Sequence, residues 1–227
     1  MAGRTYSKRE RAMERIERAR ELYEEAVFGG RSAALAIADR TLDAVEADLA
    51  LARGRVLHAR YLEEKVEDPR ELELLERAAE LYQRLGDPRG EGEAWFWMGC
   101  VHQVIRGDEE AAAPAFVRAR ELATLASDEL TLSYVLRHIA FLDRAAGRLD
   151  VAWERMEEST RLRRKVEFLP GVAANLVALG YLAAEAGHPD RALALVDEAT
   201  AVAEASAAYG ILRWAEEARA NLFPSSS

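Results

Sequence analysis

The strongest constraint in this sequence is the regular spacing of the segments that break helices. Each breaker contains glycine or proline, and from residue 67 onward they recur every 40 residues, at 67–69, 107–109, 147–150 and 187–190. Positions between them keep the same interval, because the residues at 79, 119, 159 and 199 are all small. Self-similarity at a fixed period of roughly 20 to 50 residues is typical of a stack of identical structural units. The chain is therefore predicted to be built from tandem repeats.

The segments between the breakers are predicted to be helices. Apolar residues recur three and four positions apart, and Ala, Leu, Glu and Arg, which favour helix, predominate. No strand-like alternation of useful length occurs in the sequence. Small residues lie seven or eight positions before three of the breakers, as Gly99, Ala140 and Gly180, and a small side chain lets two helices approach closely. Each repeat is therefore predicted to be a pair of antiparallel helices in an all-α fold.

Two motifs within the repeats are those of a known family. The first-helix motif reads Trp95-x-x-Met98-Gly99-x-x-His102 in one repeat and Leu176-x-x-Leu179-Gly180-x-x-Ala183 in another. The second-helix motif, an alanine, a bulky residue and a small residue, reads Ala112/Phe116/Ala119, Ala152/Met156/Ser159 and Ala192/Val196/Ala199. In both motifs the chain resembles the tetratricopeptide repeat (TPR) family, in a bacterial type with a 40-residue repeat. The resemblance implies tandem helical hairpins stacked into a right-handed TPR-like superhelix, an α-solenoid.

On this pattern, residues 7–222 are predicted to form a single repeat domain. Its predicted divisions are a degenerate N-terminal helical pair at 7–46, repeats at 47–86, 87–126, 127–166 and 167–206, and a C-terminal capping helix at 208–222. Within the N-terminal pair, Ser32 is predicted to begin a helix that ends near Ala47. Residues 1–6 and 223–227 are predicted to be flexible termini.

Composition favours a cytoplasmic protein without nucleic acid or membrane as a partner. No run of about 18 apolar residues exists, so no transmembrane helix is predicted. The single cysteine, Cys100, excludes an intramolecular disulfide, and the sequence opens without a signal-peptide pattern, which fits a reducing compartment. The net charge of −9 disfavours a chain whose main role is to grip phosphate backbones. A heavy bias toward Arg over Lys favours a bacterial source.

The TPR resemblance also implies a binding groove, because the first helix of each repeat lines the concave wall of the superhelix. The groove-facing positions of the family fall, repeat by repeat, on Arg53, Val56, Leu57 and Arg60, on Glu93, Phe96, Trp97, Cys100 and Gln103, on Tyr134, Arg137, His138 and Phe141, and on Ala174, Val177, Ala178 and Tyr181. The predicted site consists of Arg60, Phe96, Trp97, Cys100, Tyr134, Arg137, His138, Phe141 and Tyr181 among them. The aromatic members would pack an apolar or aromatic ligand, while Arg60, Arg137 and His138 would meet an anionic group. The alternative interpretation is that these aromatic residues are ordinary core side chains, because a slip of one position would turn half of them inward.

Three functions are open at this point. The first is a non-enzymatic scaffold that binds another protein or a peptide in the groove, and the second is a regulatory module that senses a small aromatic or apolar ligand in the same groove. The third, a remote alternative, is an enzyme with Cys100 as nucleophile and His138 as base. The four histidines have no metal-ligand spacing, and no cofactor-binding motif is present, so neither a metal nor a cofactor is expected.

The sequence also gives predictions for a basic stretch and for the apolar surface of the terminal units. The basic stretch Arg161, Arg163, Arg164 and Lys165 is predicted to be a solvated helix face, with a docking surface for acidic partners as the alternative. Self-association is expected if a terminal unit leaves apolar surface uncovered.

Overall fold

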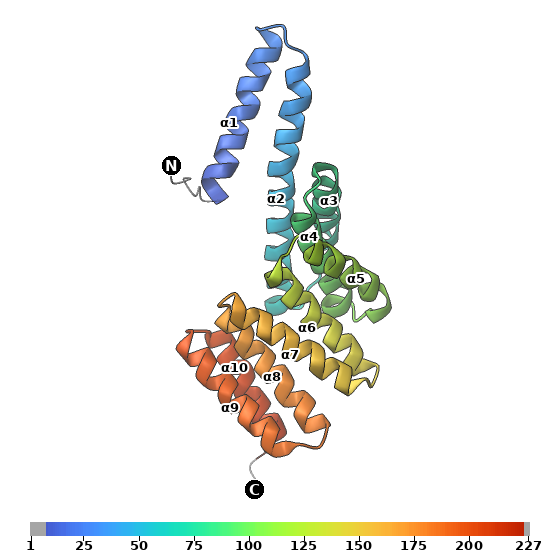
Figure 1. Ribbon diagram of the computed structural model, residues 1–227, viewed down its shortest axis with the longest axis vertical. Coiled ribbons are helices and arrows are strands. Elements are labelled where there is room, and N and C mark those ends of the chain that lie inside the picture. The colour runs from blue at the N-terminus through green and yellow to red at the C-terminus, as the bar shows by residue number, and fades with distance from the viewer. Residues whose placement is uncertain (1–7, 225–227) are drawn as a thin grey trace. The chain divides into compact units, whose positions relative to one another are not determined.

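The computed structural model describes residues 8–224, and every regular element in that range is helical (Figure 1). This confirms the all-α fold class. The predicted flexible residues 1–6, and the last three residues of the predicted flexible segment 223–227, lie outside the described range. The chain forms two compact units, one up to Gly107 and one from Asp108, and each is described by itself.

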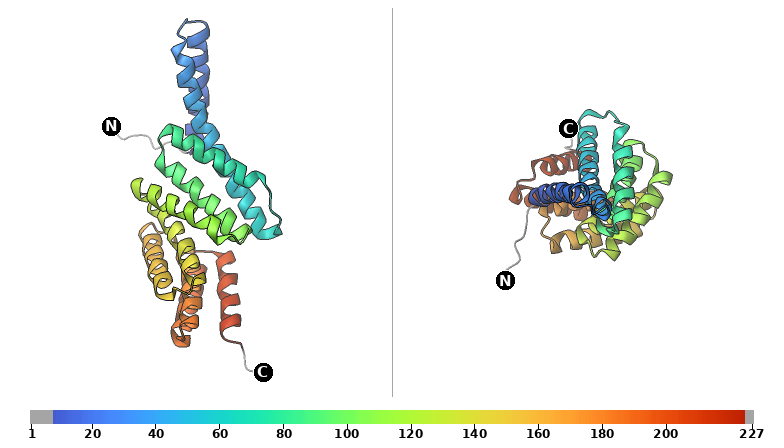
Figure 2. Two further views of the ribbon diagram at one scale, coloured as in Figure 1. Left: turned by 90° about the vertical axis from the view of Figure 1, so that its right-hand side faces the viewer. Right: turned by 90° about the horizontal axis from the view of Figure 1, so that it is seen from above.

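The first unit consists of four α-helices and a short π-helical segment. Its elements are α1 (Lys8–Val27), α2 (Ala33–Glu64), α3 (Arg70–Leu85), α4 (Pro88–Cys100) and the π-helical segment Val101–Ile105. Helices adjacent in sequence pack on each other, and Figures 1 and 2 show α1 lying alongside the first part of α2. The main core lies where α2, α3 and α4 meet, around Leu75, Leu81 and Val101. A smaller cluster of mostly alanine side chains joins α1 to α2.

The prediction that a helix ends near Ala47 is wrong, because α2 is a single helix of 32 residues. No glycine or proline occurs in it before Gly54, and alanine and leucine predominate, so nothing local stops the helix. Gly54 itself sits against α3, where a Cβ atom would lie 2.6 Å from Leu75 Cδ2. The helix ends at Lys65, which adopts the left-handed conformation and donates its backbone N–H to Tyr61 O. The predicted boundary at 46/47 therefore falls inside a helix.

The second unit is a run of six helices that begin 20 residues apart. They are α5 (Glu109–Leu125), α6 (Glu129–Ala145), α7 (Leu149–Lys165), α8 (Leu169–Glu185), α9 (Pro189–Ala205) and α10 (Tyr209–Leu222). Each packs on the next, and α10 also packs on α8. The central helix is α8, in which every residue from Gly171 to Gly180 is buried. At Gly180 a Cβ atom would lie 3.0 Å from Val196 Cγ2, so a small residue permits the close approach of α8 and α9.

The turns between these helices explain why the sequence repeats every 40 residues although the helices begin every 20. A residue in the left-handed conformation follows each of the helices α5 to α9, at Ser127, Gly147, Glu167, Gly187 and Ala207. The next residue closes the turn: the N–H of residue 128 donates to Ala123 O, and the N–H of residue 148 donates to Asp143 O, both at 2.8 Å. This is the Schellman helix end, which usually carries glycine. Only alternate turns do so here, so the sequence displays a 40-residue period while the helices recur every 20.

Candidate functional site

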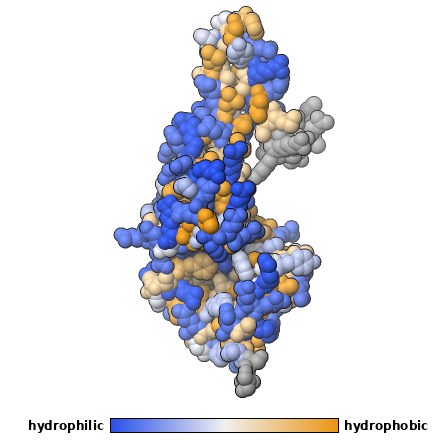
Figure 3. All heavy atoms as spheres, turned by 180° about the vertical axis from the view of Figure 1, so that it is seen from behind, coloured by the Kyte–Doolittle hydropathy of each residue, from blue (hydrophilic) through white to orange (hydrophobic). Residues whose placement is uncertain are grey.

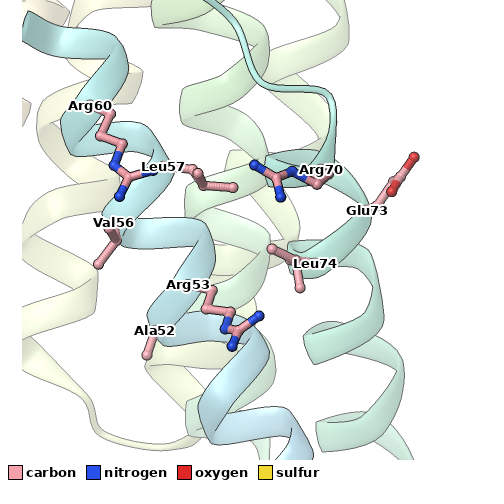
Figure 4. A pocket seen from close by; sticks show the side chains of 8 residues that line it. All are labelled: Ala52, Arg53, Val56, Leu57, Arg60, Arg70, Glu73 and Leu74. Carbon is pink, nitrogen blue, oxygen red and sulfur yellow. The ribbon is translucent and has the colours of Figure 1, made fainter.

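An open cavity of about 570 Å³ lies between α2 and α3 in the first unit. Its lining is an apolar floor with charged side chains around it: Ala52, Arg53, Val56, Leu57, Arg60, Arg70, Glu73 and Leu74. Figure 4 shows Arg53 and Leu57 of α2 turned toward α3, with Arg70 and Leu74 turned toward α2. Of the predicted groove positions, Arg53, Val56, Leu57 and Arg60 lie here. We refer to this space as the α2–α3 cavity.

A second cavity, of about 230 Å³, lies among α6, α8 and α10 in the second unit. It is lined by Arg137, Ala140, Phe141, Arg144, Val177, Ala178, Tyr181, Leu182, Trp214 and Glu217. The structure thus brings together five predicted groove positions, and Arg137, Phe141 and Tyr181 of the predicted site are joined by Val177 and Ala178. Sequence reasoning missed Trp214 and Glu217, because α10 was interpreted only as a cap. It also missed Arg144, which lies seven residues after Arg137 and so on the same helix face. We refer to this space as the α6–α8–α10 cavity.

Arg137 is held rigidly at the edge of this cavity. Its Nη1 donates hydrogen bonds to the backbone oxygen of Ala174 and to Oδ1 of Asn175, both at 2.8 Å. Its guanidinium carbon lies 4.8 Å from the centre of the Phe141 ring. Burial, and then the nearby Arg163, lower the pKa of Arg137 to about 9, so the group is still charged at neutral pH. Within residues 8–224 no carboxylate pairs with it.

Next to Arg137 lies a second arginine, Arg163, which is buried and only 2% exposed, whereas Arg137 is half-buried. Its Nη1 donates to Gly171 O at 2.8 Å and to Asn175 Oδ1 at 3.0 Å, and its guanidinium carbon lies 4.8 Å from the centre of the Tyr134 ring. Its Nη2 is buried without a hydrogen-bond partner. Burial lowers the pKa of Arg163 to about 10. The expected solvated basic face is therefore wrong for this residue.

The other members of the basic stretch are solvent-exposed, as predicted. Arg161 pairs with Glu158, Arg164 with Glu198, and Lys165 with Glu129. Arg163 differs because it lies one helical turn after the buried Ser159, on the face of α7 that packs into the unit. Helical position, and not residue type, therefore decides which of the four basic residues is buried.

A buried polar network joins α6, α7 and α8 beneath the cavity. Asn175 is its centre, since its Oδ1 accepts from both arginines and its Nδ2 donates to Ser159 Oγ at 2.8 Å and Thr160 Oγ1 at 3.1 Å. Its amide is therefore fully used and fixed in orientation. Two guanidinium groups share neutral acceptors here. Among the described residues, neither arginine forms an ion pair, although the carboxylate of Glu217 also lines the cavity.

Tyr134 and His138 lie beside the same cavity without lining it. The Tyr134 ring packs against Phe168 at 5.8 Å between centres, and the His138 ring packs against Phe141 at 5.7 Å. Both side chains are half-buried. His138 therefore contacts a lining residue from outside the cavity, and Tyr134 packs against side chains that do not line it, so neither is at the predicted surface position.

In the first unit, the predicted groove residues Phe96, Trp97 and Cys100 do not line the α2–α3 cavity. Phe96 and Cys100 are buried, which matches the alternative interpretation as core side chains. Trp97 is half-buried, with its ring centre 5.1 Å from that of His58. His58 Nδ1 lies 2.9 Å from Glu71 Oε1, and both side chains are buried. The sequence did not predict this pair, because a glutamate near the start of a helix is usually exposed to solvent.

Cys100 offers little support for nucleophilic chemistry. Burial, and then the Glu71 carboxylate, raise the pKa of its thiol well above the usual range. The thiolate, and not the thiol, is the reactive species. Cys100 also belongs to the first unit, whereas His138 belongs to the second.

Two further features bear on possible ligands. Within the described range, no group of three or more His, Cys, Asp and Glu side chains is arranged to hold a metal ion. None of the helices there combines the length and the apolar character needed to cross a membrane.

Comparison with solved structures shows distant similarity. No family model matches the chain, and no curated protein matches it. The crystal structure of BtubC (BKLC) from P. vanneervenii is similar at 19% sequence identity and a TM-score of 0.45, over 86% of this chain and 89% of that one.

Proposed function

We propose that the protein is a non-enzymatic binding scaffold whose second unit takes up a segment of another protein in the α6–α8–α10 cavity. The observation that carries the proposal is the combination, in one cavity, of an unneutralised guanidinium with three aromatic rings. Arg137 supplies the charge, and Phe141, Tyr181 and Trp214 supply the rings. The TPR resemblance supports the choice of face, since α6 and α8 are first helices of the predicted repeats.

The cavity predicts the chemistry of the bound segment. The Arg137 side chain is half-buried and forms no ion pair with a carboxylate of the described residues, so a carboxylate from a partner is favoured beside it. The rings next to it favour an aliphatic or aromatic side chain. Arg144 is already paired with Glu185 at 2.6 Å, which leaves Arg137 as the anion-binding group. The segment therefore presents an acidic residue next to a bulky apolar one.

The size of the cavity favours a peptide over a free small molecule. Cavities that enclose drug-sized ligands have volumes of roughly 300 to 1,000 Å³, so about 230 Å³ suits one or two side chains of a longer segment. The sensing of a small aromatic ligand is thus the second candidate. It predicts that a free aromatic carboxylate raises the melting temperature of the chain as strongly as a peptide does.

Selection from a random peptide library displayed on phage tests the proposal, with the full chain as bait. We expect enriched peptides to combine Asp or Glu with an aromatic or aliphatic residue. Arg137→Met and Trp214→Ala should each weaken a selected peptide by about tenfold or more, as loss of an interface anchor does. Arg161→Met, at an exposed arginine on α7, is the matched control. Enrichment of peptides without acidic residues, or equal binding by Arg137→Met, would contradict the proposal.

A further inference from the structure

The longest helix of the chain carries a row of exposed apolar side chains. Leu35, Leu42, Leu49 and Val56 lie seven residues apart along α2, and each exposes between 43% and 54% of its surface. A seven-residue apolar repeat keeps one face of a helix directed at a partner helix. The opposite side of α2, with Ala47, Leu51 and Gly54, is the one buried in the unit.

Helix α1 widens this apolar face. Met13, Ile16, Tyr23 and Val27 each expose more than half of their surface and fall on one side of α1. Helices α1 and α2 meet through Leu22 and a few alanines. In each helix, exposed apolar residues follow directly after residues that contact the other helix: Tyr23 and Val27 follow Leu22 and Ala26, and Leu35 follows Ala34. Each apolar row is therefore rotated in the same sense about its own helix axis, away from the contact between the helices. Because the two helices are antiparallel, that rotation turns both rows to the same side of the hairpin.

The combined surface is large enough for a stable interface. Eight side chains about half exposed present on the order of 700 Å², close to the roughly 800 Å² that each partner contributes to a standard protein–protein interface. Figure 3 shows apolar residues at the surface along the hairpin, among charged ones. Exposed apolar area of this extent is typical of an interaction site.

Charge and spacing identify the partner helix. Along the row, Asp39 flanks the first half of α2 and Arg53 the second, and within the described range neither forms an ion pair. If a second α2 is placed antiparallel with Leu35 opposite Val56, Leu42 falls opposite Leu49. The same register sets Asp39 against Arg53 twice, once on each side of the two-fold axis. The two Glu46 side chains also meet near that axis, where each is already paired with Arg77 of its own chain. A parallel arrangement would oppose like charges at Asp39 and Arg53 as well.

The same register fills the α2–α3 cavity. Val56 lines that cavity, so the hairpin tip of the second copy, which ends just before Leu35, would reach it. Phe28 lies at this tip and is 81% exposed. The Phe28 side chain is apolar, the cavity floor is apolar, and each is left uncovered in the single chain.

We propose that the face formed by α1 and α2 is a homodimer interface, in which the α2 helices of two copies pair antiparallel and the hairpin tip of each copy enters the α2–α3 cavity of the other. This interface is separate from the α6–α8–α10 cavity and does not depend on the peptide-binding proposal.

Light scattering of the purified full chain at micromolar concentration provides the first test. We expect the mass of a dimer. The double variant Leu42→Glu/Leu49→Glu should be a monomer with unchanged helix content, since it buries charge only in the interface. Val117→Glu/Leu125→Glu, which changes two exposed apolar residues of α5, should remain a dimer. A monomeric wild-type chain, or a dimer that survives the α2 substitutions, would overturn the proposal.

Charge exchange tests the partner and its direction. Asp39→Arg and Arg53→Asp should each weaken the dimer by about tenfold, and the chain that carries both changes should recover it, because the two charges meet only across the interface. If the chain that carries both changes does not dimerise, this register is excluded, and a different molecule covers the face.

Cross-linking distinguishes antiparallel from parallel pairing. A short bis-maleimide should join a chain carrying Leu35→Cys to one carrying Val56→Cys, while Leu35→Cys alone should give no dimer band. The native Cys100 is buried and serves as an internal negative control. Efficient self-linking of Leu35→Cys would show parallel pairing and overturn the proposed arrangement.

Discussion

Arg137 and Arg163 share one side-chain acceptor: Asn175 Oδ1 lies 2.8 Å from Nη1 of the first and 3.0 Å from Nη1 of the second. The two arginines come from α6 and α7, and the asparagine comes from α8. One amide thus holds two positive charges at the base of a cavity. The arrangement fixes the position of Arg137 beside the cavity, although it provides no negative charge of its own.

Replacement of Asn175 by leucine should therefore be severely destabilising. The change removes the shared acceptor and leaves buried charged donors unsatisfied, which we expect to lower the free energy of unfolding by about 3 kcal/mol or more. Urea denaturation measures the loss. Asn221→Leu, at an exposed position of α10, is the control and should change stability by less than about 0.5 kcal/mol. A similar loss in both variants would argue against a structural role for the network.

Substitutions at two turn residues should change the free energy of unfolding in opposite directions. Glu167 adopts the left-handed conformation at a position where alternate turns have glycine, so Glu167→Gly should raise the free energy of unfolding by about 1 kcal/mol. Gly147→Ala should lower it by about the same amount. Chemical denaturation at equal protein concentration compares the two variants. Loss of stability in Glu167→Gly would show that its side chain makes a stabilising contact that outweighs the backbone cost.

Two helical glycines should also respond differently to alanine. At Gly54 the new Cβ would lie 2.6 Å from Leu75 Cδ2, so overpacking of about 1 to 3 kcal/mol exceeds the gain in helix propensity of about 1 kcal/mol. At Gly210 nothing lies within 4 Å, and only the gain in propensity remains. We expect Gly54→Ala to lower the thermal midpoint and Gly210→Ala to raise it slightly. A rise of the thermal midpoint in both variants would mean that α2 and α3 can move apart at low cost to make room for the new methyl group.

The raised pKa of the Cys100 thiol predicts low reactivity in the folded chain. An aromatic disulfide reagent should label it at pH 8 far more slowly than a cysteine introduced at the exposed Ala52, and at a rate set by unfolding. The pKa is higher in the folded chain than in the unfolded one. The thiol therefore contributes stability that is present below the unfolded pKa and is lost as the pH rises above it. Rapid labelling in the native state would show an accessible thiolate.

Much of the local structure could be predicted from the sequence. Gly107, Gly147 and Gly187 mark three helix ends, and the alanine- and leucine-rich runs between breakers predict helices. The intervening turns at Ser127 and Glu167 carry no such signal, because a residue that bears a Cβ is forced there into a conformation it rarely adopts. Similarly, no local feature shows whether α2 stops at Ala47 or continues, since both halves favour helix.

The candidate site was only partly predictable. Arg137, Phe141 and Tyr181 were found because first-helix positions recur with the repeat. Trp214 was missed as a cavity residue because it belongs to the closing helix, where the repeat motif is absent. Its position depends on the packing of α10 on α8.

The sequence by itself determined the helical segments and the interval between alternate turns, because helix propensity and glycine turns act within a few residues of chain. The tertiary structure alone decided that Arg163 is buried while its neighbours Arg161 and Arg164 are exposed. The hydrogen-bond acceptors that hold Arg163 come from other helices, at Gly171 and Asn175. Burial of a charge depends on acceptors brought together by packing, and no pattern along a single helix specifies them.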